Sequence, residues 1–366
     1  MASELVVPVV VVENVRPHLG SDNLELCDVL GYQMCIPKGR YKGGELAVYF
    51  PADTLVPAEW ADKFGVRKFL KGKEQDRVGR VKLRGEPSFG LVVDIPPDQK
   101  WQEGDNVAAF YSCRKYEPPI RATAGDAAAY DEKIDPFVQK YTDIQNGRIF
   151  VDIFVNGEDV IVTEKLHGTN CKIGIVRDVD IFAGSMEVRR KRPRHKTPEG
   201  LEPYAGFDDD EIKRNTYWFP WSIKSVQDLV NDLCERNAGK VITVYGEVYG
   251  SPIQSLAYGL MGKIGFRVFD VSVDGRYLDW NEFKVLCDKH EVPVVPVLYR
   301  GPYSMDKMKE LADGNTIMEG ANHVREGIVV KPVKERTDPK IGRVVLKYIG
   351  TEYEMSKHLD MDTKDV

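Results

Sequence analysis

The chain has 366 residues, of which 42% are hydrophobic and 30% are charged, and its formal net charge at pH 7 is −6. This length is enough for two domains that each bury a core, and the composition is that of a soluble globular protein. Since no apolar run approaches the roughly 20 residues that span a bilayer, the sequence excludes an α-helical membrane protein.

The six cysteines stand far apart, and no two of them form a C-x-x-C pair. This spacing argues against a zinc site and a disulfide framework, and it favours free thiols in a reducing compartment. We therefore expect a soluble intracellular protein, cytoplasmic or nuclear.

The N-terminal run "LVVPVVVV" covers residues 5–12. It is short and lacks both a basic leader and a small-residue cleavage site, so it predicts a buried strand rather than a signal peptide. Its Pro8 indicates an edge or a bulge, because proline cannot donate to a strand ladder.

Short β-like runs and turn signals alternate over the first 110 residues. The turns "LGSDN", "PKGRYKGGE", "RGEPS" and "WQEGDN" separate runs such as "LELCDVL", "ELAVYF", "RVKL" and "GLVVDI". About five short strands, with one helix pattern in "PAEWADKFGV", are typical of a small closed barrel of the OB type.

Two segments are strongly basic although the chain as a whole is acidic. Residues 63–84 contain nine Lys or Arg against two acids, and "RRKRPRHK" at 189–196 contains six and no acid. Either segment alone is more often a solvated loop, but two of them favour a polyphosphate partner.

The β pattern ends in "KYEPPIRATAGDAAAYDEK", where Pro, Ala and Gly interrupt it. We predict a first domain over 1–120, a linker over 121–136 and a mixed α/β domain over 137–366.

The second domain contains "TEKLHGTN" at 163–170, between two β-like runs. Further along are "VYGEVYG" at 244–250, "FRVFDV" at 266–271, "REGIVVKP" at 325–332 and "VVLKYIG" at 344–350. Each places a charged or aromatic residue in a β-like run, as expected where alternate side chains of strands line a cleft.

This ordered set resembles the motifs of the covalent nucleotidyltransferases, the superfamily of polynucleotide ligases and messenger-RNA capping enzymes. The histidine in "KLHGTN" resembles the RNA-ligase branch. In the first domain, "PHLGSDNLELCDVLG" and "VKLRGEPSFGLVV" resemble the OB domains that bind transfer RNA. The implied fold class is α+β, with an N-terminal OB-type β-barrel followed by a mixed α/β nucleotidyltransferase domain of the ATP-grasp-like ligase kind.

The resemblance implies an ATP-dependent RNA ligase that joins 3′-OH and 5′-phosphate ends through a covalent lysyl-AMP intermediate. An OB domain ahead of the catalytic domain is similar to ligases that seal nicks in duplexes. The implied cofactors are ATP and Mg²⁺ or Mn²⁺, and the implied partner is nicked duplex RNA or an RNA/DNA hybrid, as in RNA repair. We expect a monomer that binds no membrane.

By the same resemblance, Lys165 is the nucleophile, Glu247 and Glu326 hold the metal, and Lys347 stabilises the transferred phosphate. A free lysine has a pKa of about 10.4, so the site must lower that pKa with a metal ion or neighbouring cations. Two carboxylates suit Mg²⁺ or Mn²⁺, which prefer hard oxygen ligands.

The resemblance also implies a set of nucleotide contacts. Phe266 is the expected stacking residue and Phe269 the expected core residue. If each of these residues is considered alone, an ordinary structural role, such as a salt bridge or core packing, is the alternative to nucleotide binding. The implied contacts are Glu164, His167, Gly168, Asn170, Arg189, Phe266, Asp270, Lys331 and Lys347.

Two positions depart from the family pattern. Met186 stands where an arginine is usual, so Arg189 or Arg190 is the candidate substitute. The motif around Lys347 lacks the usual second lysine, and Arg343 is a candidate for its phosphate contact.

Three alternatives stay open. A capping guanylyltransferase and a DNA ligase share the lysine chemistry, but they usually place the OB domain after the catalytic domain, whereas only about 20 residues follow the last motif here. The third is a non-catalytic RNA-binding protein, although the lysine and both carboxylates are present. Covalent label from ATP alone would support a ligase, label from GTP would favour a capping enzyme, and no label would favour a binding protein.

Overall fold

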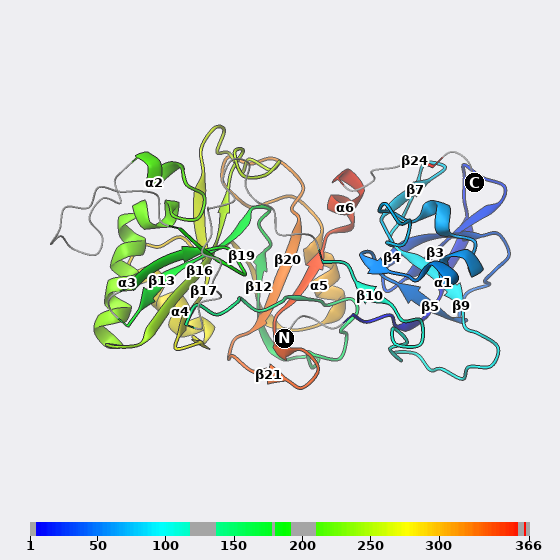
Figure 1. Ribbon diagram of the computed structural model, residues 1–366, viewed down its shortest axis with the longest axis horizontal. Helices are drawn as coiled ribbons and strands as arrows, with labels where there is room; N and C mark the ends of the chain where they lie inside the picture. Colours follow the sequence, from blue (N-terminus) through cyan, green and yellow to red (C-terminus); the bar gives the residue numbers. More distant parts are fainter. Residues whose placement is uncertain (1–4, 118–136, 178–179, 192–209, 358–361, 364–366) are drawn as a thin grey trace. The chain divides into compact units, whose positions relative to one another are not determined.

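The computed structural model describes residues 5–117, 137–177, 180–191, 210–357 and 362–363. The predicted linker over 121–136 and residues 192–196 of the second basic segment lie outside them. The chain forms two compact units, and Figure 1 shows both. The first unit is drawn from 1–119, 146–151 and 351–366, and the second from 120–145 and 152–350.

The first unit consists of short strands in small sheets, as the turn signals predicted. The sheets have the orders β1-β5-β9, β2-β3-β4, β24-β7-β8 and β10-β6. The strand bounds are Val9–Val11 (β1), Glu13–Pro17 (β2), Leu24–Val29 (β3), Tyr32–Pro37 (β4), Leu46–Phe50 (β5), Thr54–Leu55 (β6), Val81–Leu83 (β7), Glu86–Ser88 (β8), Leu91–Asp94 (β9), Arg114–Lys115 (β10) and Asp362–Thr363 (β24).

Local sequence explains the first unit's elements. β1 lies in the apolar N-terminal run, and Pro8 precedes it in an isolated bridge with Asn106. β3 and β4 form a hairpin through Leu30 and Gly31, which both have positive φ, as a two-residue turn of type I′ requires. The predicted helix is α1 (Ala58–Lys63), followed by a 3-10 turn, η1 (Arg67–Phe69).

The second unit contains two larger antiparallel sheets. The six-stranded sheet has the order β15-β14-β13-β16-β17-β18 and the five-stranded sheet the order β11-β23-β20-β12-β19. The bounds in the six-stranded sheet are Thr169–Val176 (β13), Asp180–Gly184 (β14), Arg189–Arg190 (β15), Val241–Tyr249 (β16), Gly265–Val273 (β17) and Arg276–Tyr277 (β18). Those in the five-stranded sheet are Gln145–Asn146 (β11), Asp159–Glu164 (β12), Val297–Pro302 (β19), Gly327–Pro332 (β20) and Leu346–Ile349 (β23), and Thr337–Asp338 (β21) pairs separately with Gly342–Arg343 (β22).

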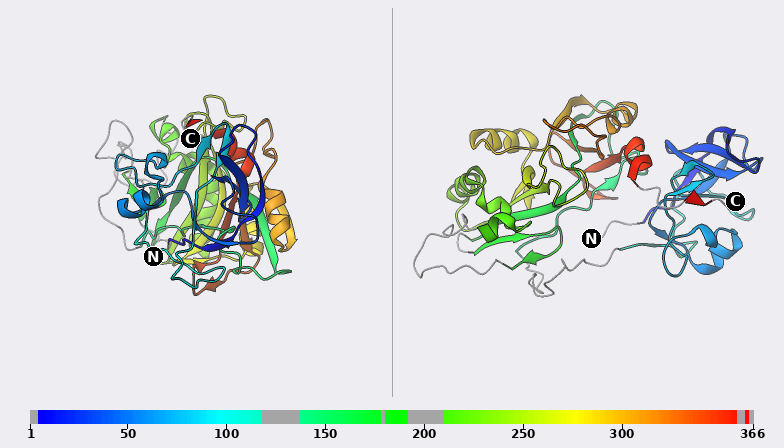
Figure 2. Two further views of the ribbon diagram at one scale, coloured as in Figure 1. Left: turned by 90° about the vertical axis from the view of Figure 1, so that its right-hand side faces the viewer. Right: turned by 90° about the horizontal axis from the view of Figure 1, so that it is seen from above.

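Helices cover one face of the six-stranded sheet. α3 (Lys224–Arg236) and α4 (Trp280–Lys289) bury their apolar faces in one core cluster with alternate residues of β13, β16 and β17. Figure 2 shows these two helices, in light green and yellow, side by side. The remaining helical elements are α2 (Asp210–Arg214), η2 (Phe219–Ser222), α5 (Met305–Ala312) and α6 (Thr351–Lys357).

The opposite face of the same sheet carries both polar side chains and a small apolar cluster, and we call it the site face. Directly opposed residues of antiparallel strands project to the same side. Asn170 of β13 is opposite Glu247 of β16, and Lys172 is opposite Tyr245. These four residues therefore share the site face, while Ile173, for example, points to the helices.

A β-bulge in β17 decides which of its residues reach the site face. Gly246 pairs with Val268 and Tyr245 pairs with Asp270, so Phe269 is an extra residue in the ladder. Phe266 and Val268 pack in the helix-covered core, whereas Asp270 lies opposite Tyr245 on the site face. Without the bulge, strict alternation would place Asp270 on the same side as Phe266.

Among the described residues, none of the helices is sufficiently long and apolar to span a membrane.

Candidate active site

A cavity of about 190 Å³ opens between strands of the two sheets of the second unit. Its walls combine apolar side chains with a few polar groups, which is the usual composition of a small-molecule site. It is lined by Tyr141, Ile144, Thr163, Glu164, Lys165, Leu166, Asn170, Glu247, Phe269, Val295, Val329 and Lys331.

Lys165 directly follows β12 and reaches into this cavity. Its backbone N–H donates to the carbonyl of Gly327 at 2.9 Å, which fixes the strand end beside β20. Its Nζ donates to Glu326 Oε1 at 2.6 Å, and the other oxygen of Glu326 lies 3.3 Å from His167 Nδ1. The structure thus brings three of the predicted residues together from segments far apart in the sequence.

The two carboxylates differ in their proton affinity. Burial raises the pKa of Glu247 to about 8, with Lys165 opposing and Glu326 reinforcing that shift. Burial also acts to raise the pKa of Glu326, but Lys165 and His167 outweigh it and bring that pKa to about 2. Glu326 is therefore ionised at neutral pH, and Glu247 holds a proton far more strongly than Glu326 does.

Lys165 keeps its proton in this state. Burial works against the ammonium form, but Glu326 and Glu247 outweigh burial and raise the lysine pKa above its ordinary value. The sequence led us to expect a lowered pKa. The surroundings that the structure describes do the reverse, because the nearest charges are carboxylates.

Asn170 completes this side of the cavity, and Gly168 lies behind it against Glu247 and Val248. A Cβ on Gly168 would lie 2.3 Å from the carbonyl oxygen of Val248, so only glycine fits. The Gly168 N–H donates to the carboxylate of Glu247. Asn170 stands opposite Glu247, and its Oδ1 is buried with no hydrogen-bond partner among the described residues.

Glu164 and His167 flank the lysine. Glu164 is 1% exposed, its Oε2 accepts from the Ile317 N–H at 3.0 Å, and its Oε1 has no partner among the described residues. His167 is held at its backbone, where its N–H donates to Tyr258 Oη at 2.7 Å, and its Nε2 lies 3.4 Å from Ser255 Oγ.

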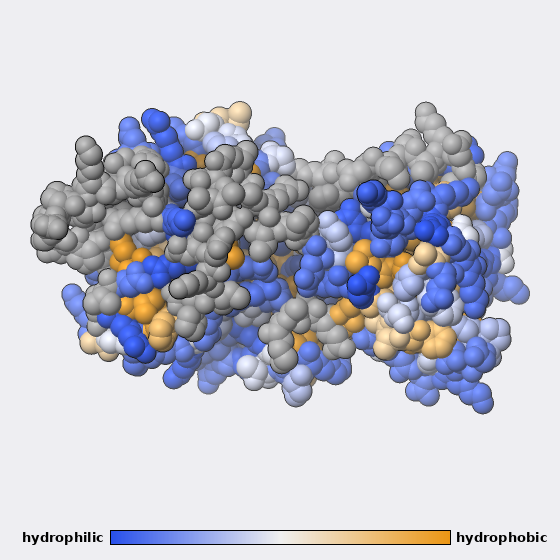
Figure 3. All heavy atoms as spheres, in the orientation of Figure 1, coloured by the Kyte–Doolittle hydropathy of each residue, from blue (hydrophilic) through white to orange (hydrophobic). Residues whose placement is uncertain are grey.

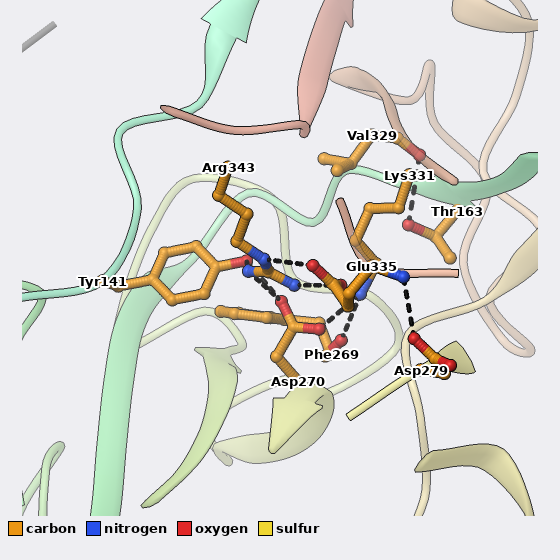
Figure 4. Close-up of polar contacts among 9 residues, drawn as sticks. All are labelled: Tyr141, Thr163, Phe269, Asp270, Asp279, Val329, Lys331, Glu335 and Arg343. Carbon is orange, nitrogen blue, oxygen red and sulfur yellow. Dashed lines mark hydrogen bonds and ion pairs between the residues drawn. The ribbon is translucent and has the colours of Figure 1, made fainter. Parts of the chain in front are cut away.

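Asp270 is the centre of a buried charge network (Figure 4). Lys331 Nζ donates to Asp270 Oδ1 at 2.6 Å, and Arg343 donates to Oδ2 at 3.0 Å. Arg343 also makes a two-pronged contact with Glu335, at 2.6 and 2.8 Å. Asp270 and Arg343 do not line the cavity, whereas Lys331 does.

The structure separates the two phenylalanines of "FRVFD". Phe269, the bulge residue, lines the cavity, and Phe266 is 3% exposed in the helix-covered core. The Phe266 ring packs over Gly246, where an added Cβ would meet it at 2.3 Å.

Besides Arg343, three predicted cations do not line the cavity. Arg189 forms a bidentate ion pair with Asp180, with both contacts at 2.7 Å, and Arg190 lies over the Tyr217 ring. Lys347 pairs with Val329 in the ladder, so it projects from the sheet face that carries this cavity-lining valine.

The residues of the cavity wall that the motif analysis missed include Tyr141 and Ile144. They lie in the segment 137–145, which has no clear periodicity and no family motif. The only sequence signal was an aromatic residue shortly before the first strand of the second domain. Tyr258 was missed as well, because it acts on His167 through a single backbone contact.

Solved structures share this fold along nearly the whole chain. A Naegleria gruberi RNA ligase with PPi is 22% identical, with a TM-score of 0.68 over 97% of this chain and 99% of that chain. Two variants of that enzyme, one with ATP and Mn and one with AMP and Mn, are each 22% identical with TM-scores of 0.69, over 98% of this chain and 100% of theirs. The fold is therefore that of a ligase with an OB-type domain at its N-terminus.

Family models identify the chain itself. An OB-fold domain model matches residues 6–95, and the RNA ligase model matches residues 158–349, which is more than half of the chain. The chain belongs to the RNA ligase family, and the predicted resemblance and fold class are confirmed. A search of curated proteins found no matching sequence.

Proposed function

We propose that this chain is an ATP-dependent RNA ligase that seals 3′-OH/5′-phosphate nicks in duplexes through AMP bound covalently to Lys165. The observation that carries the proposal is the position of Lys165 Nζ. It lies in a cavity of the family's catalytic region, 2.6 Å from Glu326, and it interacts electrostatically with Glu247. The ATP, AMP and PPi named for the similar Naegleria structures support it.

The reaction consists of three phosphoryl transfers. The Lys165 amine, after losing a proton, attacks the α-phosphorus of ATP, so a phosphoramidate bond forms and pyrophosphate leaves. The 5′-phosphate of the RNA then displaces the lysine and receives AMP. Finally, the 3′-hydroxyl loses its proton, attacks the activated phosphate and expels AMP.

Glu164 accounts for a preference for adenine. Its buried Oε1 is an acceptor that no described residue satisfies, and it belongs to the cavity wall. The amino group of adenine is a donor for this oxygen, whereas guanine has a carbonyl at the same position. In a complex with guanine, Glu164 Oε1 and the guanine carbonyl oxygen would face each other as two acceptors with no proton between them. This arrangement costs binding free energy.

Phe269 is the aromatic residue we assign to stacking on the base, in place of Phe266. It lines the cavity, and its ring meets Tyr141 edge-on with the ring centroids 5.1 Å apart. Lys331 and Lys347 lie on strands beside the cavity and are the cations we assign to the phosphates.

Glu247 and Glu326 fit a divalent ion. No group of three or more His, Cys, Asp or Glu in the described part of the chain could hold a metal by itself. Mg²⁺ is commonly bound by one or two carboxylates together with substrate phosphates, and Mn²⁺ takes similar ligands. When bound, such an ion neutralises phosphate charge and offsets the two carboxylates that keep Lys165 protonated.

The first unit is the part we assign to gripping the RNA. Some cations of its basic segment have protein partners: Arg80 pairs with Glu354, and Arg67 with Asp62. Lys63, Lys68, Lys73 and Arg84 are exposed. On the face of this unit at the right of Figure 3, hydrophilic residues surround an apolar area.

Covalent labelling tests the catalytic proposal. The protein is incubated with α-labelled ATP, or with GTP in parallel, in the presence of Mg²⁺ or Mn²⁺, and analysed on a denaturing gel. We expect label from ATP and none in Lys165→Ala, which should still seal a nick whose 5′ end is already adenylylated. Label from GTP alone would favour a capping enzyme, and no label would favour a non-catalytic RNA-binding protein.

The RNA assignment is tested with the full chain. Binding of a nicked duplex should weaken steeply with salt, because each neutralised phosphate releases about one counterion. When Lys68, Lys73 and Arg84 are all replaced by alanine, binding should release up to about three fewer counterions, so the affinity should depend less steeply on salt. Labelling of Lys165 should be retained. An unchanged salt slope would show that these residues do not contact RNA.

A further inference from the structure

The segment 137–145 supplies a wall of the nucleotide cavity from outside the catalytic motifs. It precedes the residues 158–349 that the RNA ligase model matches, yet Tyr141 and Ile144 both line the cavity. Phe137 and Val138 anchor its start, where Arg177 lies over the Phe137 ring and Val138 packs in a cluster with Phe182.

Tyr141 is fixed at both its backbone and its side chain. Its N–H donates to the carbonyl of Met186 at 3.3 Å, and its hydroxyl donates to Asp270 Oδ2 at 2.5 Å (Figure 4). Burial and the neighbouring Asp270 raise the pKa of Tyr141 well above its ordinary value, so the hydroxyl keeps the proton that it donates. The ring packs edge-on against Phe269, the residue assigned to stacking on the base.

Lys172 holds the same segment from the sheet below. It is 0% exposed, and its Nζ donates to the backbone carbonyls of Gln139 at 2.9 Å, Met186 at 3.3 Å and Val138 at 3.4 Å. Two of these carbonyls belong to the segment, and the third also accepts from the N–H of Tyr141. An ammonium group has three N–H donors, so the carbonyls match its full capacity.

A lysine is a costly choice for this position. A buried ammonium loses its hydration and is tolerated only where polar partners replace the water. A core that needed only to be filled would be served by an apolar side chain of similar volume. The hydrogen bonds from Lys172 to the three carbonyls instead fix the distance between the segment and the site face, and thereby the position of the Tyr141 ring.

We propose that Tyr141 is a nucleotide-binding residue whose ring packs against the purine base beside Phe269, and that Lys172 is the positioning residue that holds it there. This inference rests on the proposed function, because it takes the cavity to be the site of ATP. It adds one binding residue and one positioning residue, both outside the motif positions assigned above.

The test is direct binding of ATP, measured by calorimetry in a Lys165→Met background so that no covalent step follows. Tyr141→Ala should raise the Kd for ATP about tenfold, the loss expected for one aromatic wall. Lys172→Met should raise it roughly fivefold, because the wall is present but no longer held. Trp221→Phe is the matched control, since Trp221 is fully buried on the helix-covered face of the same sheet and donates to Phe182.

A double-mutant cycle separates positioning from general destabilisation. If Lys172 acts through the segment that carries Tyr141, the double variant should bind ATP no more weakly than Tyr141→Ala alone. Additive effects on Kd, or an equal loss in Trp221→Phe at a similar Tm, would overturn the positioning role. If Lys172→Met does not fold, Lys172→Gln, which keeps N–H donors on a shorter side chain, takes its place in the cycle.

The outcomes distinguish this inference from the proposed function. If the Lys165→Met parent does not bind ATP, the proposed function fails, and this inference fails with it. If the parent binds ATP and Tyr141→Ala binds it equally well, the inference alone is wrong. A higher Kd in Tyr141→Ala with an unchanged Kd in Trp221→Phe supports Tyr141 as part of the site.

Discussion

Asp270 shows how a single buried carboxylate is kept ionised. Burial alone would raise its pKa, but Arg343 and Lys331 outweigh burial and lower the pKa from 3.8 to about 2. Because the carboxyl pKa is lower in the folded than in the unfolded protein, the ionised group stabilises the fold. This stabilisation is fully present at a pH above the pKa of the unfolded state, and it is lost as the pH falls through the pKa of the folded state. The relevant window therefore extends from about pH 4 down to about pH 2.

We predict that Asp270→Asn lowers the free energy of unfolding by roughly 2–3 kcal/mol at pH 7, the equivalent of the pKa shift. Below pH 4 the difference between wild type and variant should shrink, because the wild-type carboxylate also takes up a proton. Urea denaturation at several pH values measures both quantities. A difference that stays constant down to pH 3 would contradict the ion-pair origin of the stabilisation.

Glu164 gives a second prediction at the residue scale. Glu164→Gln replaces a two-acceptor group by an amide that can rotate to offer a donor, so it should admit guanine. We expect the preference for ATP over GTP in Lys165 labelling to fall by about tenfold, the effect of one mismatched hydrogen bond. Labelling rates with the two nucleotides measure it, and an unchanged ratio would mean that Glu164 faces no base edge.

At the scale of elements, the bulge in β17 joins two requirements that a regular strand cannot meet. Phe266 must enter the helix-covered core, while Asp270 must meet Arg343 on the site face. The extra residue, Phe269, shifts the alternation by one position between them.

Deleting Phe269 should restore the regular ladder. The Asp270 side chain would then point into the apolar core beneath α3 and α4. An unpaired carboxylate buried there costs several kcal/mol, so we expect a loss of stability of more than about 3 kcal/mol and little soluble protein. Deletion of Met261, which is 77% exposed in a loop, is the control and should leave the protein folded. Circular dichroism during heating distinguishes the two variants, and a stable Phe269 deletion would show that the bulge can move.

The bulge also explains what the sequence could not predict. The apolar alternation and the ordered motifs pointed to the strands of the second domain and to Lys165 and Glu247, which line the cavity, and Glu326, which contacts Lys165. The assignment of Phe266 as the stacking residue came from a motif position, which cannot show an extra residue in the ladder. Tyr141 and Lys172 could not be found either, because neither lies in a motif and no sequence pattern shows a contact with backbone carbonyls or with an aspartate far along the chain.

At the scale of the whole molecule, the first unit draws on three separate parts of the sequence. Residues 146–151 and 351–357 are grouped with the N-terminal segment, although the sequence suggested a first domain over 1–120. The first and last of these parts are joined by an ion pair in which Arg80 Nε lies 2.9 Å from Glu354 Oε1. The Glu354 side chain is only 3% exposed.

We predict that Glu354→Gln destabilises the first unit by roughly 1–3 kcal/mol, because Arg80 then lacks its charged partner. The measurement is hydrogen exchange of β3, β4 and β5, which should become faster, while exchange in β13 and β16 of the second unit stays unchanged. Glu352→Gln, a nearby change of the same kind, serves as the control. Faster exchange throughout the chain would contradict a local role for the ion pair.

The discontinuous first unit also sets an order of events during synthesis. A ribosome releases the N-terminal strands long before it reaches Glu354, so Arg80 must wait for its partner until the whole second unit has been made. The second unit, whose residues between 152 and 350 follow one another along the chain, can complete its sheets first. On a nascent chain, the segment made first is therefore among the last to reach its final stability.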